Sequence, residues 1–228
     1  MKTSSLLRII KNWKNPYFAR NAILYKLISF IYRKNNGFFL FSEKWDNLII
    51  LDACRYDTFE EQFKKNDMEG NLDKKISRGC HTISFLLENF KKSKYEDIVY
   101  ITANPHVDLL IKDKFFKVIS VWKDGWSEKE HTVLPETIYE YTLDAIAKFP
   151  EKKKIIHFMQ PHFPYIGFKL KEDSSEIFRN AVIKGKDVKL KKNYSDKLFS
   201  WFSLDLYAMI KRKDHFKLYK KNLEIVLP

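Results

Sequence analysis

Residues 47–57 read NLIILDACRYD, a short apolar run followed at once by a dense polar cluster. The run from Leu48 to Leu51 is continuously apolar, which is typical of a strand covered on both faces, as in a parallel sheet flanked by helices. Ligands of such sheets bind at the carboxyl ends of the strands. Asp52 and Arg55, which follow the run, are therefore candidates for a metal or anion site. The alternative is that Asp52 only caps the strand and that Arg55 forms a surface pair with Asp57.

The composition predicts one globular α/β domain with appendages, because 45% of the 228 residues are hydrophobic and 16% are aromatic. The net charge of +13 indicates an anionic partner: nucleic acid, a membrane surface, or a phosphorylated or sulfated substrate. No nucleic-acid-binding motif is present in the sequence. The two cysteines, Cys54 and Cys80, are too far apart for a CxxC motif, a pattern typical of a reduced cytoplasmic protein.

The N-terminal part, residues 1–44, is predicted to form basic amphipathic helices, because apolar residues recur there at helical spacing between Lys and Arg. Two interpretations are open. The helices pack on the flank of the domain, or residues 1–32 contact an anionic membrane surface. The apolar run 22–32 contains Lys26 and is shorter than the ~20 residues of a membrane span. We therefore expect a cytoplasmic protein, with peripheral contact at the inner membrane face as the alternative.

A helix is predicted to begin within SRGCHTISFLLENF, residues 77–90, because the apolar residues from 83 onward have helical spacing. His81 or Thr82 falls at its start, and Gly79 permits an unusual backbone just before it. The amides and the positive dipole end of a helix favour an anionic ligand and a hydroxyl that must lose its proton. The alternative is that Thr82 only caps the helix.

Four predicted strands each end in a polar cluster, and this recurrence indicates a catalytic edge. His162 is the most constrained of the candidates, because two prolines flank it and hold an extended loop. The strands are residues 47–51, 97–103, 115–122 and 154–159, the helices between them include 59–65 and 135–148, and the clusters lie at Asp52, Asn104, Trp122 to Trp126 and His162.

The C-terminal part, residues 169–228, is predicted to be a mostly helical, Lys-rich insertion up to residue 215 followed by a final helix over 216–227. The apolar residues of 195–210 have the helical spacing of core packing and not of a ligand box. The chain is thus divided into the helical segment 1–44, an α/β core at 45–168 and the helical segment 169–228.

Five motifs, LDACRYD, GCHT, VYITANPH, VWKDGW and IIHFMQPHFPYIG, occur in this order, and the set resembles the sulfatase-like branch of the alkaline phosphatase superfamily, particularly its archaeal members. The resemblance covers residues 45–168, and HFMQPHFPY is its most specific part. It implies a three-layer α/β/α sandwich with a mostly parallel sheet, and one or two divalent metals at the carboxyl edge. It also implies a hydrolase or transferase that acts on an anionic phosphate or sulfate ester.

The resemblance assigns a role to each candidate residue. Asp52 would bind the metal, which would be zinc, manganese or calcium, and Thr82 would be the nucleophile bound to the same ion. Asn104 would donate to a non-bridging oxygen of the substrate. His162 would contact the substrate anion or the leaving-group oxygen, and Arg55 would add positive charge.

The sequence departs from the family pattern in two places. The run CHTIS lacks the Pro and Arg of the CxPSR motif in which sulfatases convert a Cys to formylglycine, so Thr82 is preferred to Cys80 and phosphoryl chemistry to sulfate chemistry. No Asp-His-Gly or Asp-Asn element follows His162, so the chain is interpreted as the front of a longer enzyme or as a naturally short protein. In either case we expect weak metal binding and little turnover by this chain alone. The alternative function is a non-catalytic basic protein that binds an anionic polymer or a membrane surface.

Overall fold

The computed structural model of this protein describes residues 36–168 and 206–227, together with positions 24, 27, 179, 180 and 183. It divides the chain into two compact units, Met1–Gly37 and Phe38–Pro228. In the first unit, Leu24 and Leu27 are helical; the rest of the helices predicted there lies outside the described residues. Most of the insertion predicted over 169–215 also lies outside them.

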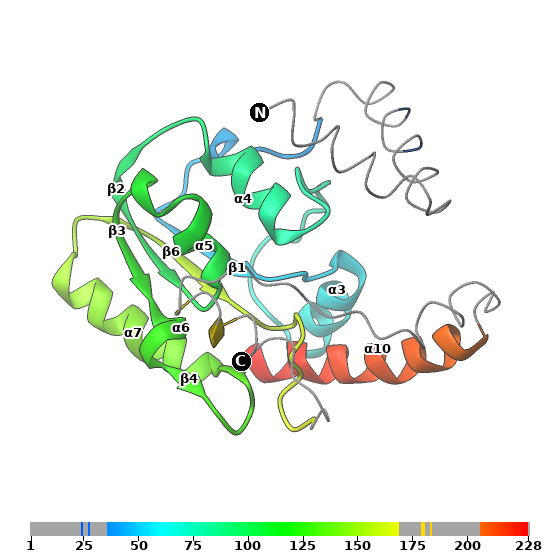
Figure 1. Ribbon diagram of the computed structural model, residues 1–228. Coiled ribbons are helices and arrows are strands. Elements are labelled where there is room, and N and C mark those ends of the chain that lie inside the picture. The colour runs from blue at the N-terminus through cyan, green and yellow to red at the C-terminus, as the bar shows by residue number, and fades with distance from the viewer. Residues whose placement is uncertain are drawn as a thin grey trace, which may run out of the picture. The chain divides into compact units, whose positions relative to one another are not determined.

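A four-stranded parallel sheet is the centre of the second unit (Figure 1). Its order is β1 (Asn47–Leu51), β6 (Lys153–Phe158), β2 (Tyr95–Thr102), β3 (Phe115–Ser120). The register aligns Ile50 with His157, His157 with Thr102, and Thr102 with Ser120. The carboxyl ends of the four strands therefore meet at one edge, as the sequence predicted for an α/β protein.

Helices cover both faces of this sheet because the side chains of β2 alternate between two cores. On one face, α4 (Thr82–Phe90) and α5 (Pro105–Leu110) pack against Ile98 and Tyr100. α7 (Pro135–Lys148) lies on the other face (Figure 1). There it packs against Val99 and Ile101. The connections from β1 to β2 and from β2 to β3 run in one direction across the sheet, and the connection from β3 to β6 runs in the opposite direction. Because parallel crossovers all have the same hand, the reversal places α7 on the opposite face from α4 and α5.

Several element boundaries differ from the sequence prediction. The first strand was expected to be covered on both faces, and this is wrong: β1 is an edge strand among the described strands, and Ile49 is 63% exposed. β3 ends at Ser120 because the short helix α6 (Val121–Asp124) follows it. The predicted turn after α6 leads into an antiparallel pair, β4 (Trp126–Ser127) and β5 (Thr132–Val133). Helix α3 (Tyr56–Lys65) begins three residues before its predicted start.

The segment that precedes β1 packs on the core. It contains a 3-10 turn, η1 (Leu40–Ser42), and the ring of Phe41 stacks on Tyr95 with 4.5 Å between centroids. Trp45 also packs against this core and donates its indole N–H to the Leu40 carbonyl at 2.9 Å. These aromatic contacts make residues 38–45 part of the second unit and not an extension of the N-terminal helices.

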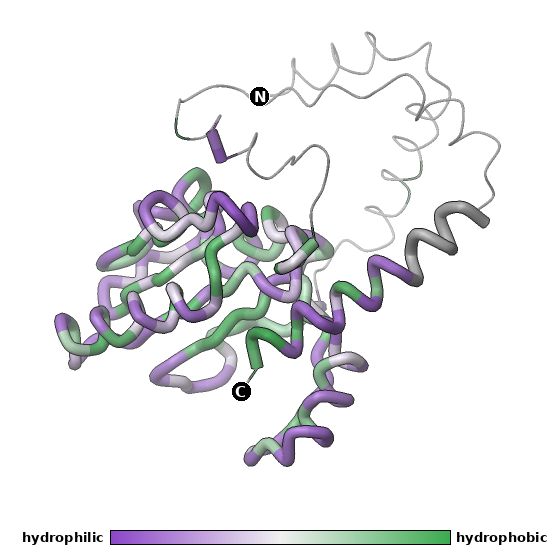
Figure 2. Tube along the Cα trace, turned by 90° about the horizontal axis from the view of Figure 1, so that it is seen from below, coloured by the Kyte–Doolittle hydropathy of each residue, from purple (hydrophilic) through white to green (hydrophobic). Residues whose placement is uncertain are grey.

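The last helix, α10 (Leu206–Val226), is continuous across residue 215, where the sequence pattern was divided into an insertion and a final helix. Hydrophobic residues gather at its C-terminal end, while hydrophilic and hydrophobic residues are mixed along its middle (Figure 2). Leu223 is fully buried. Within the part of the chain that the structure covers, no helix is both long and apolar enough to span a membrane.

Candidate functional site

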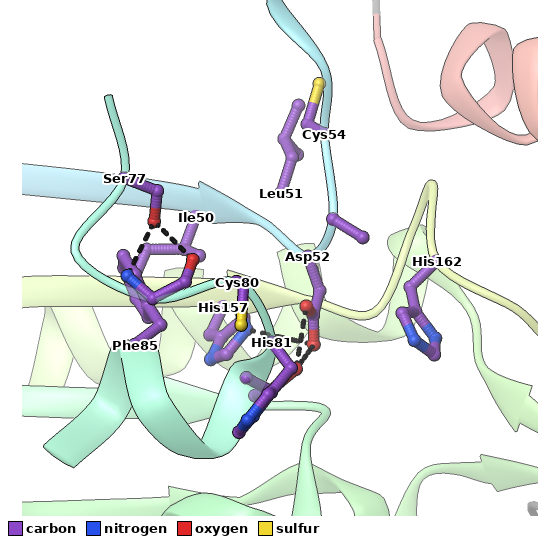
Figure 3. Close-up of a pocket in the computed structure, with 13 residues that line it drawn as sticks. Ile50, Leu51, Asp52, Cys54, Ser77, Cys80, His81, Phe85, His157 and His162 are labelled. Carbon is purple, nitrogen blue, oxygen red and sulfur yellow. Dashed lines mark hydrogen bonds and ion pairs between the residues drawn. The ribbon is translucent and has the colours of Figure 1, made fainter. Parts of the chain in front are cut away.

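A cavity of about 540 Å³ lies at the carboxyl edge of the sheet. Its walls come from the end of β1, from the loop before α4, and from the segment around β6 (Figure 3). In this view Asp52 lies between His157 and His162. The lining residues are Ile50, Leu51, Asp52, Ala53, Cys54, Ser77, Gly79, Cys80, His81, Thr82, Phe85, His157 and His162.

Asp52 is the centre of the polar contacts at this cavity. Its carboxylate is only 8% exposed and accepts the Thr82 hydroxyl, whose Oγ1 is 3.1 Å from Oδ1 and 3.2 Å from Oδ2. The Asn104 amide donates to Oδ2 at 2.7 Å. Three residues that lie far apart in the sequence therefore meet at one carboxylate, because β1 and β2 end, and α4 begins, at the same edge.

His157 is the second buried ionisable group of the site. Its Nδ1 lies 3.0 Å from the Tyr100 hydroxyl, and its Nε2 lies 3.6 Å from Asp52 Oδ2. The second distance is too long for a hydrogen bond but short enough for an ion pair when His157 is protonated. Among the described atoms Nε2 has no hydrogen-bond partner, although the residue is only 1% exposed.

The surroundings of Asp52 keep its carboxylate charged. Burial raises its pKa, but the neighbouring His157 imidazole, the charge of His162 and the Asn104 amide outweigh burial and lower the pKa from 3.8 to about 2. The negative charge in turn contributes, after burial, to a Tyr100 pKa well above its usual range. Asp52 is therefore an anion at every physiological pH.

Thr82 is the first residue of α4, and His81 is the residue that caps this helix. His81 Nδ1 accepts the Ser84 N–H at 3.2 Å, so the Thr82 hydroxyl is left free to donate to Asp52. Gly79 has an unremarkable φ, but a Cβ at this position would lie 2.2 Å from the Phe85 backbone nitrogen. Glycine is thus required there for close approach of the loop to α4, and not for an unusual backbone.

Asn104 points at Asp52 and does not belong to the cavity lining. It caps α5, and its Oδ1 accepts the His106 N–H at 2.9 Å. Its own N–H donates to the Thr102 hydroxyl at 2.9 Å. This places the Asn104 amide as an orienting partner of the carboxylate.

His162 lines the cavity from the loop after β6. Its backbone N–H donates to the Asp52 carbonyl at 3.1 Å, which joins the two loops of the site. The ring is exposed, and its Nδ1 lies 2.5 Å from the Phe163 carbonyl oxygen. The peptide bonds Gln160–Pro161 and Phe163–Pro164 on either side are cis.

Arg55 does not join the other candidates. Its guanidinium forms an ion pair with Asp57 at 2.6 Å, its side chain is 61% exposed, and the cavity lining does not include it. The hydrogen bond and charge of Asp57 raise the Arg55 pKa. The structure therefore contains the surface pair of Arg55 and Asp57 that the sequence offered as the alternative.

The polar cluster after β3 lies outside the cavity. Trp122 donates its indole N–H to Asp108 at 2.8 Å, and both line a separate cavity of about 560 Å³ with Lys112 and Lys123. Of the four strand ends singled out from the sequence, those of β1, β2 and β6 thus contribute to the Asp52 site. β3 is on the far side of the sheet from β1.

Sequence reasoning missed His157 and Tyr100. The signal for His157 was present, because a single imidazole inside the apolar run IIHF must find a polar partner when it is buried. Its polar partner is the Tyr100 hydroxyl, and its register opposite Ile50 and Thr102 places the other ring nitrogen 3.6 Å from Asp52 Oδ2. Tyr100 carried no such signal, since tyrosine is common in buried strands.

No protein-family model, no curated protein and no solved structure matches the chain. The chemistry of the site must therefore be argued from its own residues. They provide a fixed carboxylate, a hydroxyl at a helix N-terminus, and imidazoles on two walls of one cavity.

Proposed function

We propose that this chain is a sulfatase-like member of the alkaline phosphatase superfamily, which hydrolyses or transfers phosphate or sulfate esters. The observation that carries the proposal is the contact of Thr82 Oγ1 with both Asp52 oxygens, at 3.1 and 3.2 Å, at the N-terminus of α4. In this proposal the sheet with helices on both faces is part of the three-layer α/β/α sandwich of that superfamily. The substrate anion would lie in the cavity beside Thr82.

Thr82 has the position of a nucleophile in this proposal. Its Oγ1 would form a bond to phosphorus or sulfur while the ester bond breaks, and the positive end of α4 would favour both its alkoxide and the substrate anion. Asp52 orients the hydroxyl; with a pKa of about 2 it is a weak base and would not retain the proton, which would pass to solvent. The leaving-group oxygen would take up a proton from solvent and depart as the alcohol, and water would then hydrolyse the Thr82 ester, or a second alcohol would accept the group. Asn104 orients Asp52 through a 2.7 Å hydrogen bond.

The structure supports the expected role of His162 better than that of Arg55 or Cys80. His162 faces the same cavity and would contact the leaving-group oxygen or the anion. Arg55 would have to leave Asp57 before it could add charge at the cavity. Cys80 also lines the cavity, but it carries no hydrogen bond to Asp52 in the described contacts, which favours Thr82 as the nucleophile.

The metal that the resemblance implies is tested against the donors present. Asp52 and Thr82 offer oxygens suited to calcium, manganese or zinc, yet divalent sites in proteins generally use three or more protein ligands. In residues 36–168 and 206–227, no three His, Cys, Asp or Glu side chains form a group able to hold a metal ion. In this proposal Asp52 and Thr82 are too few ligands to hold a metal ion tightly by themselves, so every step above is assigned to the chain's own residues.

Metal retention can be measured directly. After incubation with zinc, manganese or calcium and desalting, we expect far less than one metal ion per chain by elemental mass spectrometry, because two ligands bind weakly. Asp52→Asn should lower the retained metal further. One tightly bound ion per chain in the wild type would contradict this expectation.

The nucleophile can be tested with 4-nitrophenyl phosphate, bis(4-nitrophenyl) phosphate and 4-nitrophenyl sulfate. We expect Thr82→Ala to abolish 4-nitrophenol release, Thr82→Ser to retain part of it, and acid-quenched wild-type protein to carry one phosphoryl or sulfuryl group on Thr82. Thr142→Ala is the matched control, because Thr142 lies on α7 and, among the residues that the structure describes, its hydroxyl bonds the Ile138 carbonyl of its own helix. Wild-type turnover in Thr82→Ala would remove Thr82 from the mechanism.

A second candidate function is a basic protein that binds an anionic polymer or membrane surface without catalysis. It is favoured by the charge of residues 1–42, which contain eight basic and no acidic side chains. Binding to nucleic acid through this charge should weaken steeply as salt is raised. The basic residues are Lys2, Arg8, Lys11, Lys14, Arg20, Lys26, Arg33 and Lys34.

A further inference from the structure

Helix α10 contacts the turn that follows Asp52. The Tyr219 hydroxyl donates to the Ala53 carbonyl at 3.0 Å and accepts the Arg55 N–H at 2.8 Å. Both bonds join the last helix of the chain to backbone atoms 164 or 166 positions earlier. The turn between β1 and α3 is thus held from outside its own segment.

The same helix contacts the loop that carries His162. Asn222 is 1% exposed, and its Nδ2 faces the carbonyl oxygens of His162 at 3.1 Å and of Pro161 and Pro164 at 3.4 Å each. Its Oδ1 accepts the Ile166 N–H at 3.0 Å. All partners of this buried amide lie in one short loop, so the amide fixes the course of that loop.

Burial of a side-chain amide costs desolvation free energy that an apolar side chain would not. An apolar residue would fill the space without desolvating four hydrogen-bonding positions, so an amide is favoured where its bonds fix a particular geometry. Other contacts also attach α10 to the protein. Leu223 is fully buried, and Lys220 and Glu224 pair with Glu61 and Lys65 of α3.

We propose that Tyr219 and Asn222 are positioning residues that fix the Asp52 turn and the His162 loop relative to each other. They lie three positions apart, which places them on one face of α10. The two loops are also joined directly by the His162 N–H and the Asp52 carbonyl, at 3.1 Å. This inference rests on the proposed function, in which Asp52 and His162 act on one anion, and catalytic groups must be held within fractions of an ångström.

The test uses the full-length protein and two measurements. The first is the ¹⁵N-edited NMR spectrum of the histidine rings, of which the chain has six; the His162 signals are assigned with His162→Gln. The second is the affinity for inorganic phosphate, measured by calorimetry. In Asn222→Leu we expect the His162 ring signals to shift and broaden and phosphate affinity to fall by about tenfold, the effect of losing roughly one hydrogen bond's net free energy.

Matched variants separate positioning from simple destabilisation. Glu224→Gln lies on the same helix and weakens pairs with Lys65 and Gln62 of α3, which are not part of the His162 loop, so it should leave the His162 signals and phosphate affinity unchanged. Asn222→Gln keeps the amide and should restore part of the affinity. If Asn222→Leu does not fold, Tyr219→Phe retains the ring that stacks on Phe216 and removes only the hydroxyl, and the same loss of phosphate affinity is expected.

The outcomes distinguish this inference from the proposed function. Unchanged His162 signals and unchanged phosphate affinity in a folded Asn222→Leu protein would overturn the positioning role. Wild-type protein that binds no phosphate would count against the proposed function, whereas the comparison of His162 signals between wild type and Asn222→Leu would still decide the role of Asn222. Loss of phosphate affinity in Glu224→Gln as well would assign the effect to α10 docking and overturn the role of the amide.

Discussion

Asp52 is a carboxylate that the protein keeps charged in a buried position. The Thr82 hydroxyl and the Asn104 amide are hydrogen-bonded to it, and His157 lies at ion-pair distance. A buried charge is stable only with such partners. The contacts of Asp52 therefore also contribute to the free energy of unfolding. This contribution can be measured without knowing the substrate.

In Asp52→Asn the free energy of unfolding should therefore change less than in the wild type as the pH is lowered. The folded pKa of Asp52, about 2, lies below its ordinary value of 3.8, so its contribution is fully present above pH 4 and is lost as pH falls towards 2. We expect the variant to be destabilised by about 2 kcal/mol at pH 6. This difference from wild type should shrink below pH 4, as measured by urea unfolding at pH 6, 4 and 3.

Asp113→Asn is the control for this pH series, because its carboxylate side chain is 75% exposed. Its unfolding free energy should follow that of the wild type at each pH. A constant difference between Asp52→Asn and wild type from pH 6 to pH 3 would show that the charge of Asp52 does not stabilise the fold.

At the scale of the element, the loop before α4 packs directly against the first turn of this helix. His81 caps the helix, and Gly79 lets the loop approach the backbone of the first turn, where a Cβ would lie 2.2 Å from Phe85 N and 2.7 Å from Ser84 C. Both obstacles are backbone atoms, which cannot move without moving the helix start. The position of Thr82 thus depends on a residue that has no side chain with which to take part in the chemistry.

Gly79→Ala should displace the start of α4 from the loop. We expect a loss of about 1 to 3 kcal/mol in stability, as for other overpacked sites, and a loss of any turnover that depends on Thr82. Lys92→Ala, at an exposed position just after the same helix, should change stability by less than about 0.5 kcal/mol. Wild-type stability in Gly79→Ala would mean that the loop accommodates a Cβ.

At the scale of the whole molecule, charge is distributed unevenly along the chain. The eight basic residues of positions 1–42 account for much of the net charge of +13. A basic amphipathic segment binds anionic lipid through both its apolar face and its charge. The alternative of peripheral membrane contact through residues 1–32 therefore belongs to this scale and not to the Asp52 site.

Pelleting with anionic liposomes tests this contact. We expect the wild type to bind them and to be released as salt is raised, and a variant with Lys11, Lys14, Arg20 and Lys26 all changed to Gln to bind at least about tenfold more weakly. Liposomes of neutral lipid are the control, since they lack the charge. Equal binding of both proteins to anionic liposomes would exclude these four charges as the cause.

The sequence by itself determined the α/β class, the parallel strands and the edge where polar residues collect. These follow from local signals: continuous apolar runs, the proline that opens α7, and the polar residues directly after β1, β2 and β6. Asp52, Thr82 and Asn104 could be singled out for the same reason, because each lies at the end of a strand or at the start of a helix.

Tertiary structure alone decided which of these residues meet and what holds them there. Strand order puts β6 between β1 and β2, so His157 reaches Asp52, while Arg55 pairs with Asp57 and β3 carries its cluster to a different cavity. Helix α10 brings Tyr219 and Asn222 to the loops of the site from about 60 to 166 residues away in sequence. Such contacts depend on packing between distant segments, which no local pattern encodes.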